Sequence, residues 1–96
     1  IINGGGTLIR EMALGTGRLD LCVFYGENKY PIELKIRRGD QTYTEGLEKT
    51  AKYMDMLGCQ EGWLIVFDRR KTISWEDKIF VREESFGNKK ITIFGC

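Results

Sequence analysis

The sequence has no histidine, one proline and three cysteines, and these shortages exclude several kinds of chemistry. Without histidine, the chain cannot carry a serine–histidine triad, histidine acid–base catalysis or a histidine-ligated zinc ion. Cys22, Cys59 and Cys96 are too few and too scattered for a disulfide framework or a zinc site. This cysteine usage favours a reducing, cytoplasmic setting. The chain also lacks any apolar run of about eighteen residues, so no membrane-spanning helix is expected.

The composition predicts one small globular domain over residues 1–96. Of the 96 residues, 42% are hydrophobic and 30% are charged, which is typical of a folded soluble chain. The chain begins with Ile1 and has neither an initiator methionine nor a signal-like start, so we interpret it as the C-terminal piece of a longer protein. The net charge of +1 neither requires nor excludes a nucleic-acid partner.

Apolar periodicity and turn residues predict a mixed α/β domain with the order βββαβββ. A helix with one apolar stripe is expected to follow Gly39-Asp40 and to end near Leu57. The continuous apolar run at 62–67 predicts a strand covered on both faces, with a parallel neighbour in a mixed sheet. The other strands are expected at 7–14, 18–25, 30–37, 78–82 and 90–94.

The second and third strands are expected to form a hairpin with a four-residue loop, Gly26 to Lys29. Pairing Tyr25 with Tyr30 places Asp20 opposite Lys35. Opposed residues of an antiparallel pair share a face, as do residues two apart in one strand. Asp20, Glu33 and Lys35 are therefore predicted to lie on one face, with Leu21 and Ile32 among the apolar residues on the other.

Two neighbouring carboxylates and a lysine form a set that suits phosphodiester hydrolysis without histidine. Carboxylates that repel each other gain from sharing a hard cation, and oxygen ligands suit Mg²⁺ or Mn²⁺. The hypothesised mechanism is attack of a water on a phosphodiester. Asp20 and Glu33 hold the metal, and Lys35 positions the water.

Two segments resemble a known nuclease signature. Gly17-Arg18-Leu19-Asp20-Leu21 followed by Pro31-Ile32-Glu33-Leu34-Lys35 is similar to the D…(E)xK motif of the PD-(D/E)XK nuclease superfamily. Further segments resemble the C-terminal nuclease-like domain of certain prokaryotic AAA-type ATPases: Arg10-Glu11, Glu45-Gly46-Leu47-Glu48 and Phe67-Asp68-Arg69-Arg70. The likeness covers roughly residues 3 to 95.

This resemblance implies a restriction-endonuclease-like fold and a metal-dependent nuclease. It makes Asp20, Glu33 and the carbonyl of Leu34 the metal ligands and Lys35 the catalytic lysine. It also implies a nucleic-acid substrate, expected to be DNA, and an ATPase domain upstream in the same chain. The chain departs from the pattern where Leu19 replaces the motif's proline and where Lys49 and Tyr53 stand at the spacing of a glutamine–tyrosine pair. The helix that normally opens the superfamily core is not visible before Thr7.

Further candidates for the site are Glu11, Lys49 and Tyr53 as lining residues, and Arg37, Arg38 and Arg70 as phosphate contacts. Each also has a plainer interpretation as a solvated surface residue. The three central residues, Asp20, Glu33 and Lys35, could likewise form an ordinary cross-strand charge pair on a surface hairpin.

Two alternatives to the nuclease remain open at this point. The domain could keep the nuclease fold but act only as a nucleic-acid or protein docking module for an ATPase. It could instead form a homodimer through an exposed edge strand at 90–94.

Overall fold

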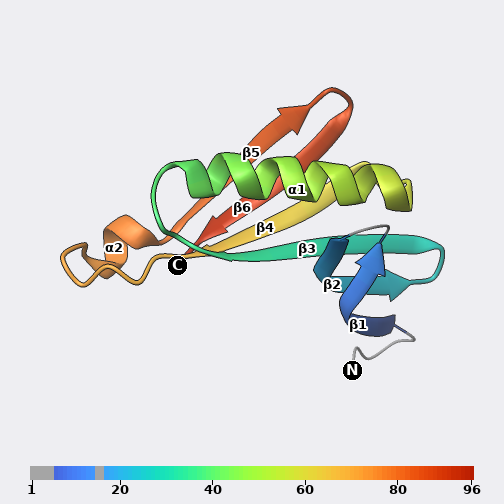
Figure 1. The fold of residues 1–96 in the computed structure, drawn as a ribbon, viewed down its shortest axis with the longest axis horizontal. Coiled ribbons are helices and arrows are strands. Elements are labelled where there is room, and N and C mark those ends of the chain that lie inside the picture. Colours follow the sequence, from blue (N-terminus) through green and yellow to red (C-terminus); the bar gives the residue numbers. More distant parts are fainter. Residues whose placement is uncertain (1–5, 15–16) are drawn as a thin grey trace.

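The computed structural model describes residues 6–14 and 17–96, and there it is a small mixed α/β domain (Figure 1). It contains a six-stranded sheet, one long helix and one short helix. The elements are β1 (Gly6–Leu14), β2 (Gly17–Tyr25), β3 (Asn28–Ile36), α1 (Gln41–Leu57), β4 (Glu61–Phe67), α2 (Trp75–Lys78), β5 (Phe80–Phe86) and β6 (Lys89–Gly95). Neither helix in this part of the chain is long and apolar enough to cross a membrane.

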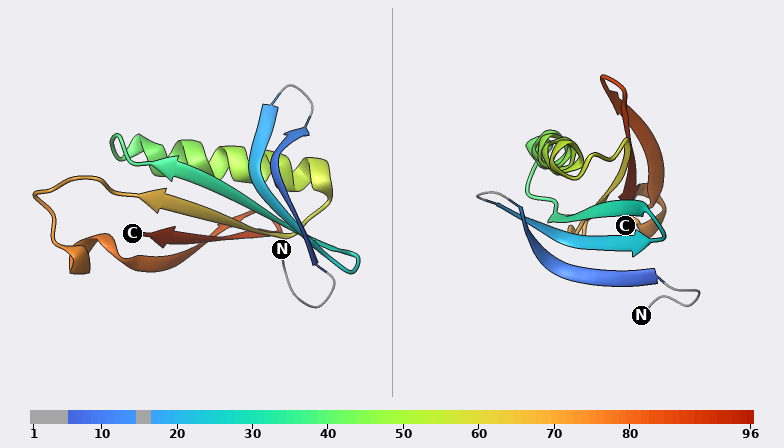
Figure 2. Two further views of the ribbon diagram at one scale, coloured as in Figure 1. Left: turned by 90° about the horizontal axis from the view of Figure 1, so that it is seen from below. Right: turned by 90° about the vertical axis from the view of Figure 1, so that its right-hand side faces the viewer.

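The strands are ordered β1-β2-β3-β4-β6-β5 across the sheet. The central strands β3, β4 and β6 run parallel. The antiparallel pair β1 and β2 extends the sheet beyond β3, and β5 lies antiparallel to β6 at the other edge. Helix α1 connects β3 to β4 and lies on one face of the sheet, which curls around it (Figure 2). The predicted helix and the parallel pairing of 62–67 are confirmed.

The core lies between α1 and the central strands. Leu64 and Val66 of β4 are fully buried, and they pack with Leu47 and Met54 of the helix. Ile91 and Ile93 of β6 complete this layer. Burial of each such side chain stabilises the fold by roughly 1.5–3 kcal/mol, so this layer fixes how α1 sits on the sheet.

Gly46 allows α1 to approach β4 closely. A Cβ atom at this position would lie 2.7 Å from Cδ1 and 2.8 Å from Cδ2 of Leu64, a fully buried side chain. We expect Gly46→Ala to lower the free energy of unfolding by about 1–2 kcal/mol, because the overpacking outweighs the better helix propensity of alanine. Urea unfolding measures this, with Thr44→Ala at an exposed helix position as the control. A Gly46→Ala protein as stable as the parent would contradict the close packing.

The β2–β3 hairpin differs from the prediction. Tyr25 pairs with Asn28, so the loop contains only Gly26 and Glu27, and the predicted pairing of Tyr25 with Tyr30 is wrong by two residues. Gly26 adopts a φ of 61°, a conformation that suits a two-residue hairpin turn. Because a shift by two residues keeps the alternation of a strand, each side chain still points to its predicted face.

Two further predictions about the C-terminal strands are corrected. The strand predicted at 90–94 is not an edge strand, because β6 lies between β4 and β5. The edges are β1 and β5, so the proposed pairing between chains through 90–94 is wrong. Lys78, predicted to begin the preceding strand, is instead the last residue of α2, and that strand begins at Phe80. The Ser74 side chain caps α2 by accepting a hydrogen bond from the Asp77 amide.

The face of the sheet opposite α1 is open in the part of the chain that the structure describes (Figure 2). Ile36 and Phe67 on this face are 44% and 41% exposed, although the apolar run at 62–67 predicts cover on both faces. A shallow apolar groove crosses the same face. It is lined by Val23, Tyr30, Ile32, Trp63, Ile65 and Phe94.

Candidate functional site

Asp20 and Glu33 come together where β2 and β3 separate. The last paired residues of these strands are Leu21 and Ile32, so the next position on each strand is Asp20 and Glu33. The carboxylate of Asp20 accepts a hydrogen bond at 2.9 Å from the backbone N–H of Leu34. This bond turns Asp20 toward the neighbouring strand and brings it beside Glu33.

Glu33 is a buried carboxylate beneath α1. Its side chain is 0% exposed, and both oxygens lack a well-directed hydrogen bond from any described residue. Lys49 Nζ of α1 lies 2.8 Å from Oε2, a short ion pair whose approach does not have good hydrogen-bond geometry. A buried carboxylate without full compensation is costly, and such a group is more typical of a site than of a core.

Burial raises the pKa of Glu33 to about 7. The Lys49 ammonium acts in the opposite direction, and the neighbouring Asp20 raises the pKa of Glu33 further. Burial lowers the pKa of Lys49, but Glu33 and Asp20 outweigh it and leave that pKa raised. Lys49 is therefore a firmly charged ammonium beside two acidic groups.

Lys35 lies on the same face of β3 as Glu33 but one pleat further along. The predicted opposition of Asp20 and Lys35 is wrong, because the hairpin register brings Asp20 to Glu33 instead. Lys35 is half-buried and lines a depression at the end of β3. Arg38 and Thr42 line the same depression. Residues two apart in a strand are about 6.6 Å apart, so Lys35 borders the carboxylates without forming an ion pair with either in the described structure.

Glu11 lies on β1, the strand next to the one that carries Asp20. Its neighbours pair as Arg10 with Leu21 and Met12 with Leu19, which puts Glu11 across from Asp20. Glu11 is exposed and has a φ of 49°, so the strand is distorted at this point. Over residues 6–14 and 17–96, no three acidic or cysteine side chains are close enough to hold a metal ion together.

The donor set nevertheless fits a magnesium-type ion. Mg²⁺ is commonly held by one or two carboxylates and completes its shell with waters and substrate phosphates. Asp20 and Glu33 supply two carboxylates, and neither oxygen of Glu33 has a well-directed hydrogen bond from a described residue, although Oε2 pairs with Lys49. The carbonyl of Leu34 belongs to the residue whose amide already binds Asp20.

Tyr53 supports the site from α1 and does not lie on the surface. Its side chain is 2% exposed and packs with Cys22 of β2. Lys49 Nζ lies 5.8 Å from the centre of the Tyr53 ring, within the range of a cation–π interaction. The helical spacing of four residues places both side chains on the same face of α1.

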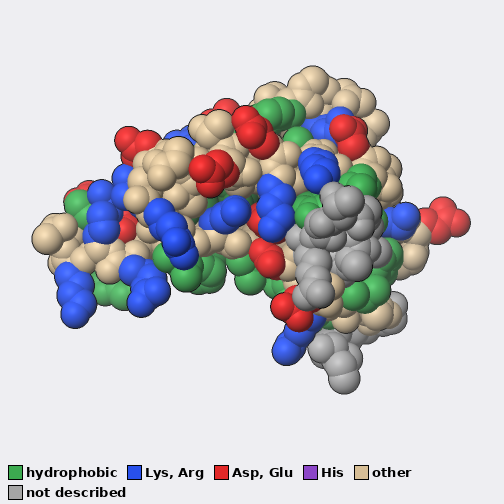
Figure 3. Space-filling view, in the orientation of Figure 1, with side chains coloured by type: hydrophobic (Ala, Val, Ile, Leu, Met, Phe, Trp, Pro, Cys, Tyr) green, Lys and Arg blue, Asp and Glu red, His purple; other side chains and the backbone are tan. Residues whose placement is uncertain are grey.

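Of the three arginines predicted as phosphate contacts, two are already engaged. Arg37 forms an ion pair with Asp40 at 2.8 Å, and Arg70 pairs with Asp68 at 2.7 Å. Arg38 is exposed, and its backbone N–H donates to the Thr42 hydroxyl. Figure 3 shows lysine and arginine side chains along α1 and at the end of the molecule that carries α2.

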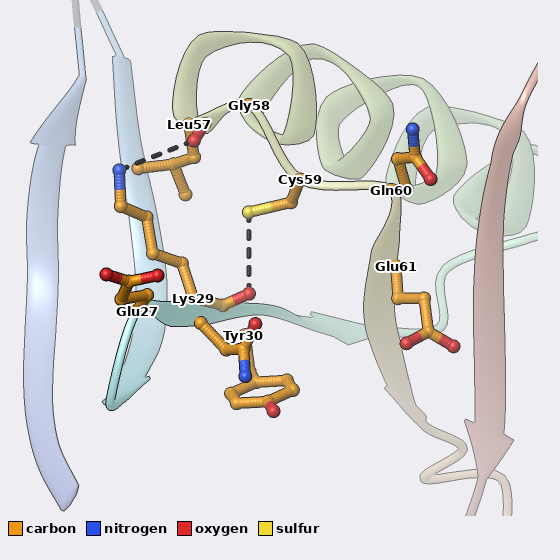
Figure 4. A pocket seen from close by; sticks show the side chains of 9 residues that line it. Glu27, Lys29, Tyr30, Leu57, Gly58, Cys59, Gln60 and Glu61 are labelled. Atoms are coloured by element: carbon orange, nitrogen blue, oxygen red, sulfur yellow. Dashed lines mark hydrogen bonds between the residues drawn. The ribbon is translucent and has the colours of Figure 1, made fainter.

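A second depression lies at the other end of α1, beside the β2–β3 hairpin (Figure 4). Lys29 Nζ donates to the Leu57 carbonyl at 3.4 Å, and the Cys59 thiol donates to the Lys29 carbonyl at 3.4 Å. Burial raises the pKa of Cys59, so the thiol stays protonated. Figure 4 shows Glu27 and Glu61 on opposite sides of the depression, so its acidic groups do not converge. The helix itself ends at Gly58, whose φ of 73° is a left-handed C-cap conformation, and the contacts of Lys29 connect that end to β3.

The site on β2, β3 and α1 could be predicted only in part from the sequence. The two acids and Lys35 share a face as predicted, whereas the contact between Lys49 and Glu33 depends on how α1 docks on the sheet. Comparisons of this chain with protein-family models, curated proteins and solved structures found no match.

Proposed function

We propose that this domain is a divalent-metal-dependent nuclease that hydrolyses nucleic-acid phosphodiesters and has a restriction-endonuclease-like core. The observation that carries the proposal is the pair of adjacent carboxylates, Asp20 and Glu33, with the buried oxygens of Glu33 lacking well-directed hydrogen bonds between β3 and α1. Structural carboxylates are usually exposed or fully bonded. In contrast, this one is kept buried and incompletely bonded.

The groups of the site have different roles in this proposal. Asp20 and Glu33 would hold Mg²⁺ or Mn²⁺ together with the Leu34 carbonyl. When bound, such an ion lowers the pKa of a water and offsets charge on the phosphate. Lys35 lines the adjoining depression and orients the attacking water there. Arg38 in the same depression contacts a backbone phosphate, which gives affinity without sequence specificity.

Lys35→Met tests the proposed chemistry. We expect the variant to lose about a hundredfold or more of the Mn²⁺-dependent cleavage rate on labelled DNA and RNA, because it loses the group that positions the water. Mn²⁺ affinity should change little, since Lys35 forms no ion pair with the two acids in the described structure. Lys29→Met is the matched control, because Lys29 lies at the opposite end of β3 from Lys35. This variant should cleave like the parent. Equal cleavage by parent and Lys35→Met proteins would exclude the role of Lys35.

One observation favours a second function. Lys49 already provides a positive charge 2.8 Å from Glu33. A nuclease-fold domain that has lost its activity would need such a charge to stabilise its two acids without a metal ion. In that case the domain serves as a nucleic-acid or protein docking module attached to an ATPase. Absence of metal binding and of cleavage in the parent protein would support this second function.

A further inference from the structure

Lys49 is placed where it affects how the two acids bind a cation. It comes from α1, whereas Asp20 and Glu33 come from the sheet. Its Nζ lies 2.8 Å from Oε2 of Glu33, and the charge of Asp20 acts on it as well. We infer that Lys49 is an internal counter-ion that competes with a divalent cation for Asp20 and Glu33. This inference rests on the metal site proposed above.

The competition follows from the small number of acceptors. Both oxygens of Glu33 are buried, so the ammonium and a metal ion must draw on the same carboxylate inside the same space. A divalent ion and an ammonium repel each other strongly in a poorly solvated site, because the interaction between charges grows as the dielectric falls. The ammonium must therefore move away as the metal enters.

Lys49 can make this movement without disturbing the core. Its side chain is 35% exposed, so solvent is accessible from its present position. Its Nζ already lies 5.8 Å from the centre of the Tyr53 ring, so the cation–π contact is part of its present position. A phosphate of a bound nucleic acid offers an alternative partner, since lysine is a common phosphate ligand. Withdrawal of Lys49 toward a phosphate would free the acids, so substrate binding and metal binding reinforce each other.

Isothermal titration of Mn²⁺ into the parent protein, Lys49→Met and Lys52→Met tests the inference. Methionine keeps the length of the side chain and removes the charge. Lys52 is the matched control, because its Nζ lies 5.9 Å from the same Tyr53 ring but forms no ion pair with Glu33. We expect Lys49→Met to bind Mn²⁺ at least about tenfold more tightly than the parent, and Lys52→Met to bind like the parent. Lys49→Gln gives a second neutral variant if the methionine lowers stability.

A second readout follows the lysine itself. Acylation of the parent protein with an amine-reactive reagent, resolved by peptide mass spectrometry, reports how accessible each ammonium is. Mn²⁺ should accelerate modification of Lys49 severalfold, because the metal displaces its ammonium from Glu33. The modification rate of Lys52 should not change. If the ammonium weakens metal binding, the metal must weaken the hold of the acids on the ammonium by the same factor. Measurable binding with equal affinity in the parent and Lys49→Met proteins would overturn the inference while leaving the metal site in place. No binding by any of the proteins would overturn the metal site as well.

Discussion

Asp20→Asn is expected to remove saturable Mn²⁺ binding and nuclease activity while leaving the fold intact. The asparagine keeps a carbonyl oxygen that can accept the Leu34 N–H, the bond that Asp20 makes at 2.9 Å. It loses the negative charge that a hard cation requires. Mutation of a residue that only hydrogen-bonds to a metal ligand typically weakens metal affinity by about 10- to 100-fold. Loss of a ligand itself should therefore weaken Mn²⁺ binding by at least about a hundredfold.

Titration calorimetry and a cleavage assay measure these losses, and thermal unfolding checks the fold. The matched control is Asp55→Asn, the same change at a carboxylate that pairs with Lys89 on the far side of α1. This control should bind Mn²⁺ and cleave like the parent. If Asp20→Asn binds the ion as tightly as the parent, Asp20 is not a ligand and the proposed site is wrong.

Stability should fall as the pH rises from 5 to 8, and Glu33 should be the main cause. The pKa of Glu33 rises from 4.5 to about 7 on folding, chiefly through burial. Between these values the folded protein keeps a proton that the unfolded chain has released. The contribution of Glu33 to the free energy of unfolding is therefore complete below pH 4.5 and is lost as the pH rises through 7. A shift of this size corresponds to about 3 kcal/mol as an upper bound.

Thermal or urea unfolding between pH 5 and pH 8 measures this slope. Glu33→Gln should flatten it, because glutamine occupies the same space and does not titrate. Glu48→Gln, at an exposed position of α1, should keep the slope of the parent. An unchanged slope in Glu33→Gln would show that Glu33 is already ionised at pH 5. The Asp68–Arg70 pair does not interfere in this range, because Arg70 lowers the pKa of Asp68 far below it.

The hairpin shows how far the sequence allows prediction. Alternation placed Glu33 and Lys35 on one face of β3, and the structure has them there. The turn was harder to predict, because Asn28 and Lys29 suit a loop or a strand, and the pairing of Tyr25 with Asn28 that makes the loop two residues long is visible only in the structure. The two-residue error changed the partner of Asp20 and left its face unchanged.

Contacts between distant elements could not be predicted in the same way. Lys49 meets Glu33 because Gly46 lets α1 approach Leu64 and sets the depth of the whole helix. Likewise, β6 pairs with β4 although β5 precedes it along the chain. A helical or strand period specifies which side of an element is apolar, and it does not specify the element that will cover that side.

The open apolar face of the sheet has a practical consequence for the unfolding experiments on parent and variant proteins. Ile36, Phe67 and Phe94 are each about two-fifths exposed on a face without a described cover. Bare apolar surface of this kind binds dyes, detergents and other protein molecules. Any of these would bind the folded state and raise the measured unfolding free energy by mass action. Parent and variant proteins must therefore be compared at one protein concentration and in one buffer, or association will be counted as stability.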